Sequence, residues 1–249
     1  MKLNSFVTLA AALLAISPFS SDAYAGEAKK PLGVVELFTS QGCSSCPPAD
    51  RLFGELAAAG DIVALAYHVD YWDYLGWRDT LGSPENTARQ YEYGKSFGVR
   101  SVYTPQAVVN GRTHVNGASR TEIMGKLSGM REGGDGLSVD VRVTQSGDSV
   151  MIDAGGANGE IDEAHLVLVY FDAPQEIAIE RGENNGKTFT YWNAVSDIQT
   201  AGMWHGKAAR YELPLSEIAK KGGCAVLLQS TGADGLPGPI LGAAVIREP

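Results

Sequence analysis

The chain has 249 residues, a formal net charge of −9 and three cysteines. An acidic chain is repelled by nucleic acid phosphates and by anionic lipid, so we expect neither as a partner. After residue 25, no apolar run approaches the roughly 20 residues that cross a bilayer, so the sequence predicts no membrane span in the mature chain.

Residues 1–25 have the features of a signal peptide. Lys2 supplies a positive start, residues 6–16 form a short apolar segment, and Ala-Tyr-Ala at 23–25 is a small-x-small cleavage pattern. We therefore expect an exported protein, periplasmic or secreted. Export leads to an oxidising compartment, where a pair of cysteines can persist as a disulfide.

Residues 32–69 have the pattern of strand, helix and strand. The apolar runs 32–38 and 61–69 each predict a buried strand. Between them, apolar residues recur at helical spacing from Pro47 until Gly60, which favours a helix end. A helix that connects two apolar strands predicts a right-handed unit with the strands parallel.

Helix and turn signals continue after that unit. Ser83 followed by Pro84 is typical of a helix start, and Gly98 predicts the end of the helix. The pair Asn110-Gly111 is typical of a tight turn between two strands. The rest of the pattern predicts a hairpin and then a helix, with bounds 106–109, 112–115 and 119–130.

A glycine-rich break at 133–136 precedes a change of pattern, to short apolar segments separated by turn residues. We therefore predict an α/β domain over 26–133 and an antiparallel β-rich, sandwich-like domain over 137–249. The polar segment 180–195 predicts a loop that docks on the first domain or contacts a partner. The strand candidates lie within 137–156, 164–172, 176–182, 209–215, 224–230 and 240–246.

Cys43 and Cys46 lie where the first strand gives way to the first helix. Free N–H groups and the dipole at a helix N-terminus stabilise a thiolate, and Pro47 fits in a first turn. Cys-x-x-Cys can close a disulfide across one helical turn, but so short a ring stabilises a fold little. The spacing therefore favours redox or metal chemistry over a structural staple. Cys224 begins an apolar strand candidate, which predicts a buried free thiol.

A metal site is the main alternative at the two cysteines. A structural zinc site needs four ligands, commonly a second cysteine pair or paired histidines, and the sequence offers neither. Cu(I) accepts fewer and softer ligands, so the alternative set is Cys43, Cys46 and His68, with His114 as a second candidate. Under the redox interpretation, the protein needs no cofactor besides a Cys43–Cys46 disulfide.

Two motifs together resemble the thioredoxin-like superfamily. Its members place Cys-x-x-Cys after a core strand, and a cis-proline before a later antiparallel strand. Here Thr104-Pro105 precedes the strand candidate, and the resemblance covers about residues 32–131. The whole mature chain resembles more closely an uncharacterised family of exported bacterial proteins, domain of unknown function 1223. That second resemblance rests on the segments 36–50, 68–79, 103–111, 179–186 and 238–245.

The resemblance implies a thioredoxin-like domain followed by a β-rich extension, and it implies site roles. Cys43 is expected as the attacking thiolate and Cys46 as the resolving thiol. A cis bond at Pro105 would turn the backbone of Thr104 toward the disulfide, where it pairs with substrate. Glu36 resembles the position of a buried acid, and we expect it under the cysteine pair as proton acceptor for Cys46.

The loop after the second strand is rich in aromatic residues. Parallel strands end at one edge of a sheet, so this loop is expected beside Cys43. Tyr71, Trp72 and Trp77 then form either a wall for a peptide or small thiol, or a cap that packs over the helix. His68 either raises the thiolate fraction of Cys43 or has a structural role.

The sequence therefore predicts an exported thiol–disulfide oxidoreductase, whose partners are thiols and disulfides of proteins or small molecules. Two alternatives remain open at this point. One is a copper-binding, metallochaperone-like protein that uses the cysteine pair and a histidine. The other is a non-catalytic binding module on a thioredoxin-like scaffold.

Overall fold

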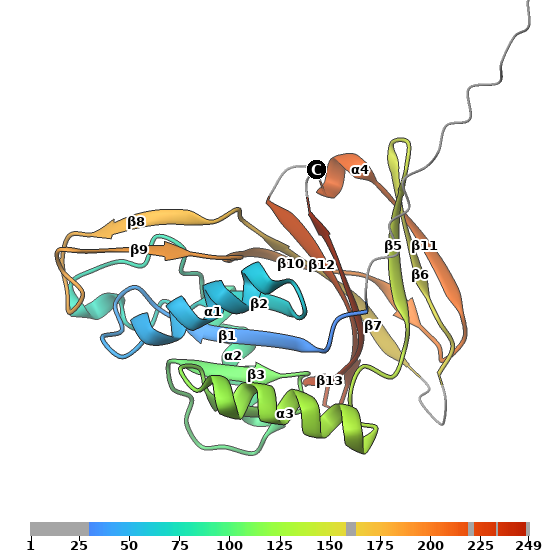
Figure 1. The fold of residues 1–249 in the computed structure, drawn as a ribbon, viewed down its shortest axis with the longest axis horizontal. Coiled ribbons are helices and arrows are strands. Elements are labelled where there is room, and N and C mark those ends of the chain that lie inside the picture. Colours follow the sequence, from blue (N-terminus) through green and yellow to red (C-terminus); the bar gives the residue numbers. More distant parts are fainter. Residues whose placement is uncertain (1–29, 158–162, 219–221, 233, 248–249) are drawn as a thin grey trace, which may run out of the picture.

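The structure is a computed structural model that describes residues 30–157, 163–218, 222–232 and 234–247. The predicted signal peptide, residues 1–25, lies outside these residues. The fold is mixed α/β and rich in antiparallel sheet (Figure 1). In the part of the chain that is described, no helix is long and apolar enough to cross a bilayer.

The helices and strands follow the predicted order closely. The first part contains β1 (Val34–Thr39), α1 (Pro47–Ala59), β2 (Val63–His68), the 3₁₀ turn η1 (Asp73–Leu75), α2 (Pro84–Ser96), β3 (Gln106–Val109), β4 (Thr113–Asn116) and α3 (Arg120–Gly133). The second part contains β5 (Val141–Ser146), β6 (Ser149–Ala154), β7 (Ala164–Phe171), β8 (Gln175–Ile179), β9 (Lys187–Tyr191), β10 (Val195–Trp204), β11 (Ala209–Pro214), α4 (Leu215–Ile218), β12 (Gly223–Thr231) and β13 (Pro237–Arg247).

The first sheet has the strand order β2-β1-β3-β4. β1 is parallel to β2, with Val34 opposite Val63, and antiparallel to β3. α1 forms the crossover between the parallel strands, which confirms the predicted strand–helix–strand unit. β3 and β4 form the predicted hairpin, and Asn110 (φ 50°) and Gly111 (φ 63°) adopt the left-handed backbone that this turn requires.

The helix ends also follow the sequence signals. Ser83 and Ser119 cap α2 and α3, because each hydroxyl accepts a hydrogen bond from the backbone N–H three residues on, at 3.1 and 3.4 Å. α1 has Cys46 as its N-cap residue and Pro47 in its first turn, and the left-handed Gly60 (φ 70°) ends it.

The second part forms a four-stranded sheet β10-β7-β12-β13, a three-stranded sheet β11-β6-β5 and the hairpin β8-β9. Sequence analysis is wrong about residues 187–204. It expected a loop up to residue 195 and no strand after it, whereas β9 and β10 occupy this stretch. β10 is an edge strand with two register shifts and many exposed side chains. Its sequence therefore lacks the apolar alternation by which the other strands were recognised.

Three apolar clusters hold these elements in layers. α1 and α3 pack on the face of the first sheet that presents Val35 and Leu37. The opposite face, with Val34 and Phe38, packs together with α2 against β7 and β12. The far side of β7 and β12 packs on β5 and β6. β7 and β12 are thus buried on both faces, and the two parts of the chain share one of the cores (Figure 1).

Candidate functional site

The two cysteines form a disulfide at the junction of β1 and α1, with their Cα atoms 5.4 Å apart. β1 ends at Thr39, and the chain turns through a bond from the N–H of Cys43 to the carbonyl of Ser40, at 3.1 Å. Cys46 is itself the N-cap residue of α1. The positive end of the helix dipole therefore lies at the pair, where it favours a thiolate once the disulfide is reduced.

The peptide bond between Thr104 and Pro105 is cis, and it lies beside the disulfide. The Sγ atom of Cys43 is 3.9 Å from the carbonyl oxygen of Thr104. The hydroxyl of Ser45 lies between them, 3.4 Å from that oxygen and 3.3 Å from the sulfur. Four of the predicted site residues, the two cysteines and Thr104-Pro105, thus come together in space.

The aromatic loop after β2 closes over this corner. The indole N–H of Trp72 donates to the hydroxyl of Thr104 at 2.8 Å, and Trp72 packs against Gly42. The hydroxyl of Tyr71 donates to the side chain of Gln90 on α2 at 3.1 Å. As a result, Cys43 is only 2% exposed and Cys46 is fully buried. The loop therefore packs on Thr104 and on α2 in this structure, and neither of its two predicted roles is tested by these contacts.

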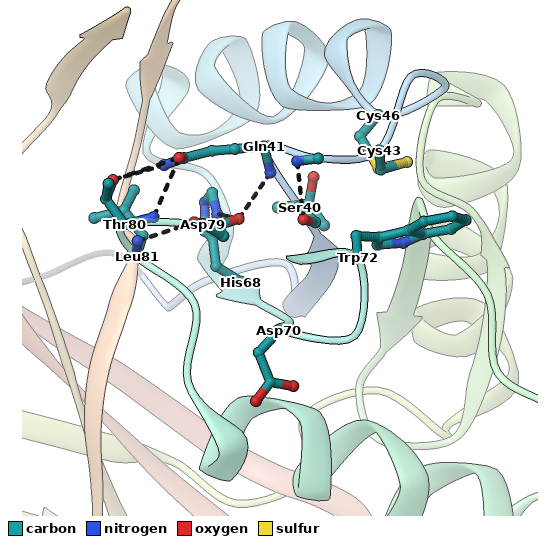
Figure 2. Close-up of polar contacts among 12 residues, drawn as sticks. Ser40, Gln41, Cys43, Cys46, His68, Asp70, Trp72, Asp79, Thr80 and Leu81 are labelled. Carbon is teal, nitrogen blue, oxygen red and sulfur yellow. Dashed lines mark hydrogen bonds and ion pairs between the residues drawn. A yellow bond between two sulfur atoms is a disulfide. The ribbon is translucent and has the colours of Figure 1, made fainter. Parts of the chain in front are cut away.

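Trp77 lies away from the sulfurs and anchors the loop that carries them. Its indole N–H donates to the side-chain oxygen of Gln41 at 2.8 Å, and the amide of Gln41 donates to Thr80 at 3.0 Å. The backbone N–H of Gln41 donates to Asp79 at 2.7 Å (Figure 2). Asn184, from the loop between β8 and β9, donates to the carbonyls of Gln41 and Cys43 at 3.0 and 2.9 Å. The segment 180–195 therefore docks on the site, which is one of its two predicted roles.

Glu36 does not lie under the cysteine pair, which corrects the expectation for this residue. Side chains alternate along β1, and Glu36 is on the face opposite to Val35 and Leu37, which pack on α1. Its carboxylate accepts from the Nε of Arg89 on α2 at 2.8 Å and from the hydroxyl of Tyr93. Glu36 is thus one half of a buried ion pair between β1 and α2.

His68 pairs with Asp79 rather than with the cysteines. Its Nδ1 is 2.9 Å from Asp79 Oδ2, and both residues are buried. Burial alone would lower the pKa of His68, but the adjacent Asp79 carboxylate outweighs burial and raises it. Burial would likewise raise the pKa of Asp79, yet His68 and two backbone N–H donors hold it below its ordinary value.

The copper alternative finds no matching geometry. Among the residues that the structure describes, no group of three or more histidine, cysteine, aspartate or glutamate side chains is placed to hold a metal ion. His114, the second histidine considered, lies on β4 and is 3.1 Å from the hydroxyl of Tyr103. Cys224 is a fully buried free thiol on β12, as predicted, and burial raises its pKa to about 12. It belongs to the core between β12 and the β5–β6 strands, on the side away from the first sheet.

Besides Asp79, sequence analysis missed a second acidic residue at the site. Asp50 lies on α1 one turn after Cys46, is 7% exposed, and accepts a hydrogen bond from the hydroxyl of Thr39 at 2.6 Å. Burial raises its pKa to about 7, although Thr39 and His68 act in the opposite direction. The signal was present, because position 50 falls on the same helix face as the buried Cys46 and Phe53.

The fold and the site define an α/β protein, rich in antiparallel sheet, that carries a disulfide where a central strand meets a helix. The chain belongs to the family described as protein of unknown function DUF1223, whose model matches residues 34–229. The crystal structure of the protein AGR_C_4864 from Agrobacterium tumefaciens is similar, with a TM-score of 0.80 and 48% sequence identity. The match covers 88% of this chain and 95% of that one. A search of curated proteins found no match.

Proposed function

We propose that this protein is an exported thiol–disulfide oxidoreductase with a thioredoxin-like first part. The observation that carries the proposal is the 3.9 Å approach of Cys43 Sγ to the carbonyl of Thr104, the residue before the cis-proline. The parallel pair β1–β2 with α1 as its crossover, and the antiparallel β3–β4 hairpin after Pro105, support the thioredoxin-like assignment. Export is supported by the signal-like residues 1–25 and by a disulfide that an oxidising compartment preserves.

The reaction is an exchange of two electrons between dithiol and disulfide. In the reduced protein, the Cys43 thiolate attacks one sulfur of a substrate disulfide, and the other sulfur leaves as a thiolate that takes a proton from water. Cys46 then attacks Cys43, the mixed disulfide breaks, and the second substrate sulfur is released as a thiol. The protein ends as the Cys43–Cys46 disulfide, and an external dithiol must reduce it for the next cycle. The same atoms run the reverse reaction, which donates a disulfide to a substrate dithiol.

The attacking sulfur is assigned from its surroundings. Cys43 lies at the Thr104-Pro105 corner and is 2% exposed, whereas Cys46 is the helix N-cap and is fully buried. We therefore assign Cys43, which lies beside the residue before the cis-proline, as the attacking sulfur. Movement of the Trp72 side chain away from this corner requires loss of its hydrogen bond to Thr104, which contributes about 1 kcal/mol for a neutral pair, and of its apolar packing.

Trapping of partners tests the proposal. In Cys46→Ser, the resolving thiol is absent, so substrates should accumulate on Cys43 as mixed disulfides that a reductant releases. The matched control is Cys43→Ser/Cys46→Ser, which retains the buried Cys224 and should trap nothing. Purified wild-type protein should also turn over disulfide peptides in the presence of a dithiol. Equal trapping by both variants together with no turnover would contradict the proposal, and would favour a binding module with an inert disulfide.

A further inference from the structure

We propose that Asn184, from the β-rich part of the chain, is a positioning residue of the cysteine pair, which holds the turn between Cys43 and Cys46 in the geometry that closes their disulfide. The inference rests on the function proposed above, because it concerns the closing of that disulfide in the resolving step. It gives the β-rich part a share in the redox centre, although both cysteines and the Thr104-Pro105 corner belong to the first part.

A tight turn joins the two cysteines. The N–H of Cys46 donates to the carbonyl of Cys43 at 3.2 Å, and Ser44 and Ser45 between them are exposed. After Cys46 the chain continues as α1, which packs on the first sheet and so holds that end of the turn. The carbonyl of Cys43 is therefore the atom on which the turn closes at its other end.

Asn184 donates to the same carbonyl from outside the turn. Its Nδ2 lies 2.9 Å from the oxygen of Cys43 and 3.0 Å from that of Gln41, so one amide group holds two points of the cysteine loop. A carbonyl oxygen has two lone pairs and can accept from Cys46 and Asn184 together. Asn184 is 1% exposed, so water does not compete for these hydrogen bonds. Its Oδ1 accepts from the ammonium group of Lys187 at 3.2 Å, which settles which end of the amide faces the carbonyls.

The loop that presents Asn184 is itself fixed by its own contacts. The N–H of Gly186 donates to the carbonyl of Ile179 at 2.8 Å, which closes the loop between β8 and β9. Gly182 has a left-handed backbone (φ 74°) and lies against Trp77, the residue that anchors the cysteine loop. Figure 1 shows the β8–β9 hairpin extending along α1, so that its loop reaches the start of this helix. The hairpin therefore delivers the amide of Asn184 to a defined place.

The hydrogen bonds of Asn184 act differently on the two redox states. In the disulfide, the covalent ring keeps the turn closed with or without Asn184. In the dithiol, hydrogen bonds hold the turn, so loss of Asn184 lets the Cys43 end move and gives the reduced form more conformational freedom. Freedom for the backbone of a single residue corresponds to roughly a tenfold change in an equilibrium constant. Asn184 therefore raises the equilibrium constant for disulfide formation by about tenfold.

The same contacts act on the rate of the resolving step. The thiol of Cys46 loses its proton to water, and the thiolate attacks the sulfur of Cys43. The Cys43–Cys46 bond forms as the bond between Cys43 and the substrate sulfur breaks, and the substrate leaves as a thiolate that takes a proton from water. This attack is faster when the turn keeps the two sulfurs within reach of each other. Asn184 binds backbone oxygens and transfers neither protons nor electrons.

Exchange with glutathione measures the equilibrium constant. Reduced protein and glutathione disulfide give the protein disulfide and two glutathione thiols, so two electrons and two protons pass to glutathione. Asn184→Ala should lower this constant by about tenfold, which corresponds to a reduction potential about 30 mV higher. Asn185→Ala changes the neighbouring exposed residue of the same loop and should leave the constant at its wild-type value.

A kinetic measurement isolates the resolving step. An aromatic disulfide such as 5,5′-dithiobis(2-nitrobenzoate) releases one coloured thiolate when Cys43 attacks it and a second when Cys46 closes the protein disulfide. In Asn184→Ala, the second release should be about tenfold slower. The first should keep its rate, because the sulfur of Cys43 faces Thr104 whereas Asn184 binds its carbonyl.

A milder variant and a stability measurement separate this role from a structural one. Lys187→Met removes the donor to Oδ1 at an exposed position, and should shift the equilibrium constant in the same direction by about twofold to threefold. A less stable Asn184→Ala with unchanged equilibrium constant and second release would overturn the Asn184 assignment, as would a shift toward the disulfide. Where Asn184→Ala does not fold, a wild-type constant in Lys187→Met overturns it. Absence of exchange with glutathione and of the first release in wild-type protein would overturn the proposed function instead.

Discussion

Replacing Glu36 by glutamine removes one charge from an ion pair that water does not reach. The Glu36 side chain is fully buried and that of Arg89 is 9% exposed, with 2.7 Å between the Nη2 of Arg89 and the carboxylate. Arg89 also donates to Gln229 at 3.0 Å and lies over the rings of Tyr67 and Tyr93. In Glu36→Gln, the guanidinium keeps its charge and loses its counter-ion, so the variant contains an uncompensated buried cation.

The expected loss follows from that environment. Removing one partner of a buried ion pair typically lowers the free energy of unfolding by about 3 to 5 kcal/mol. For a chain of this size, 1 kcal/mol corresponds to a shift in Tm of about 2 to 4 °C, so we expect Tm to fall by roughly 10 °C. Glu55→Gln is the matched control, because Glu55 pairs with Arg120 and their side chains are 68% and 50% exposed. That change should lower the free energy of unfolding by less than about 1 kcal/mol.

Urea unfolding of the two variants and the wild type measures the difference directly. The double variant Glu36→Gln/Arg89→Met should recover part of the loss, because it removes the unpaired charge as well. Under conditions where Glu36→Gln is folded, its thiol exchange should match the wild type, since the carboxylate faces away from Cys46. Equal stability of Glu36→Gln and Glu55→Gln, or a selective loss of the resolving step in Glu36→Gln, would refute this reasoning.

Three other changes test separate parts of the site. Trp72→Ala should speed reduction of the disulfide by a small dithiol about fivefold, because it removes the hydrogen bond that holds this side chain on Thr104. Met203→Ala, at a 42% exposed side chain on β10, should not change the rate, and equal rates for all three proteins would argue against a covering role of Trp72. Asn184→Ala leaves the carbonyls of Gln41 and Cys43 without their donor and should lower the free energy of unfolding by about 1 to 3 kcal/mol. Urea titration measures this loss, and Asn185→Ala at the neighbouring exposed position is the control. Burial raises the pKa of Asp50 to about 7, so the stability that this group contributes is present below about pH 4 and is lost as pH rises through 7. Over that range, the free energy of unfolding of Asp50→Asn should therefore rise relative to the wild type by about 4 kcal/mol. Parallel plots of this free energy against pH for the two proteins would contradict the raised pKa.

Local signals in the sequence determine the helices, the turn and the cysteine site. The serine caps, the prolines after Cys46 and the Asn110-Gly111 turn act through hydrogen bonds and backbone angles within a few residues. The approach of the cysteines to Thr104-Pro105 spans a longer distance. It was predicted only from the resemblance of the two motifs to a known superfamily, and in the structure both motifs flank strands that pair in one sheet.

The position of Glu36 could not be derived in the same way. Every residue of β1 is buried, so the apolar pattern does not say which face of the strand packs on α1. The face is decided by the contact with Arg89, which in turn donates to Gln229, and both residues lie far along the chain. The docking of Asn184 was equally hidden, because a polar side chain in a loop gives no sign of which carbonyls it will meet.

The sharing of one apolar core between the two parts has a practical consequence for anyone who wishes to move this disulfide centre into another protein. A fragment that stops at the glycine-rich break near Gly133 would present Val34, Phe38 and Tyr67 to water, because their cover comes from β7 and β12. Such a surface favours aggregation over independent folding. Transplanting the cysteine motif therefore requires the β-rich part as well, since the part that carries the cysteines packs against it.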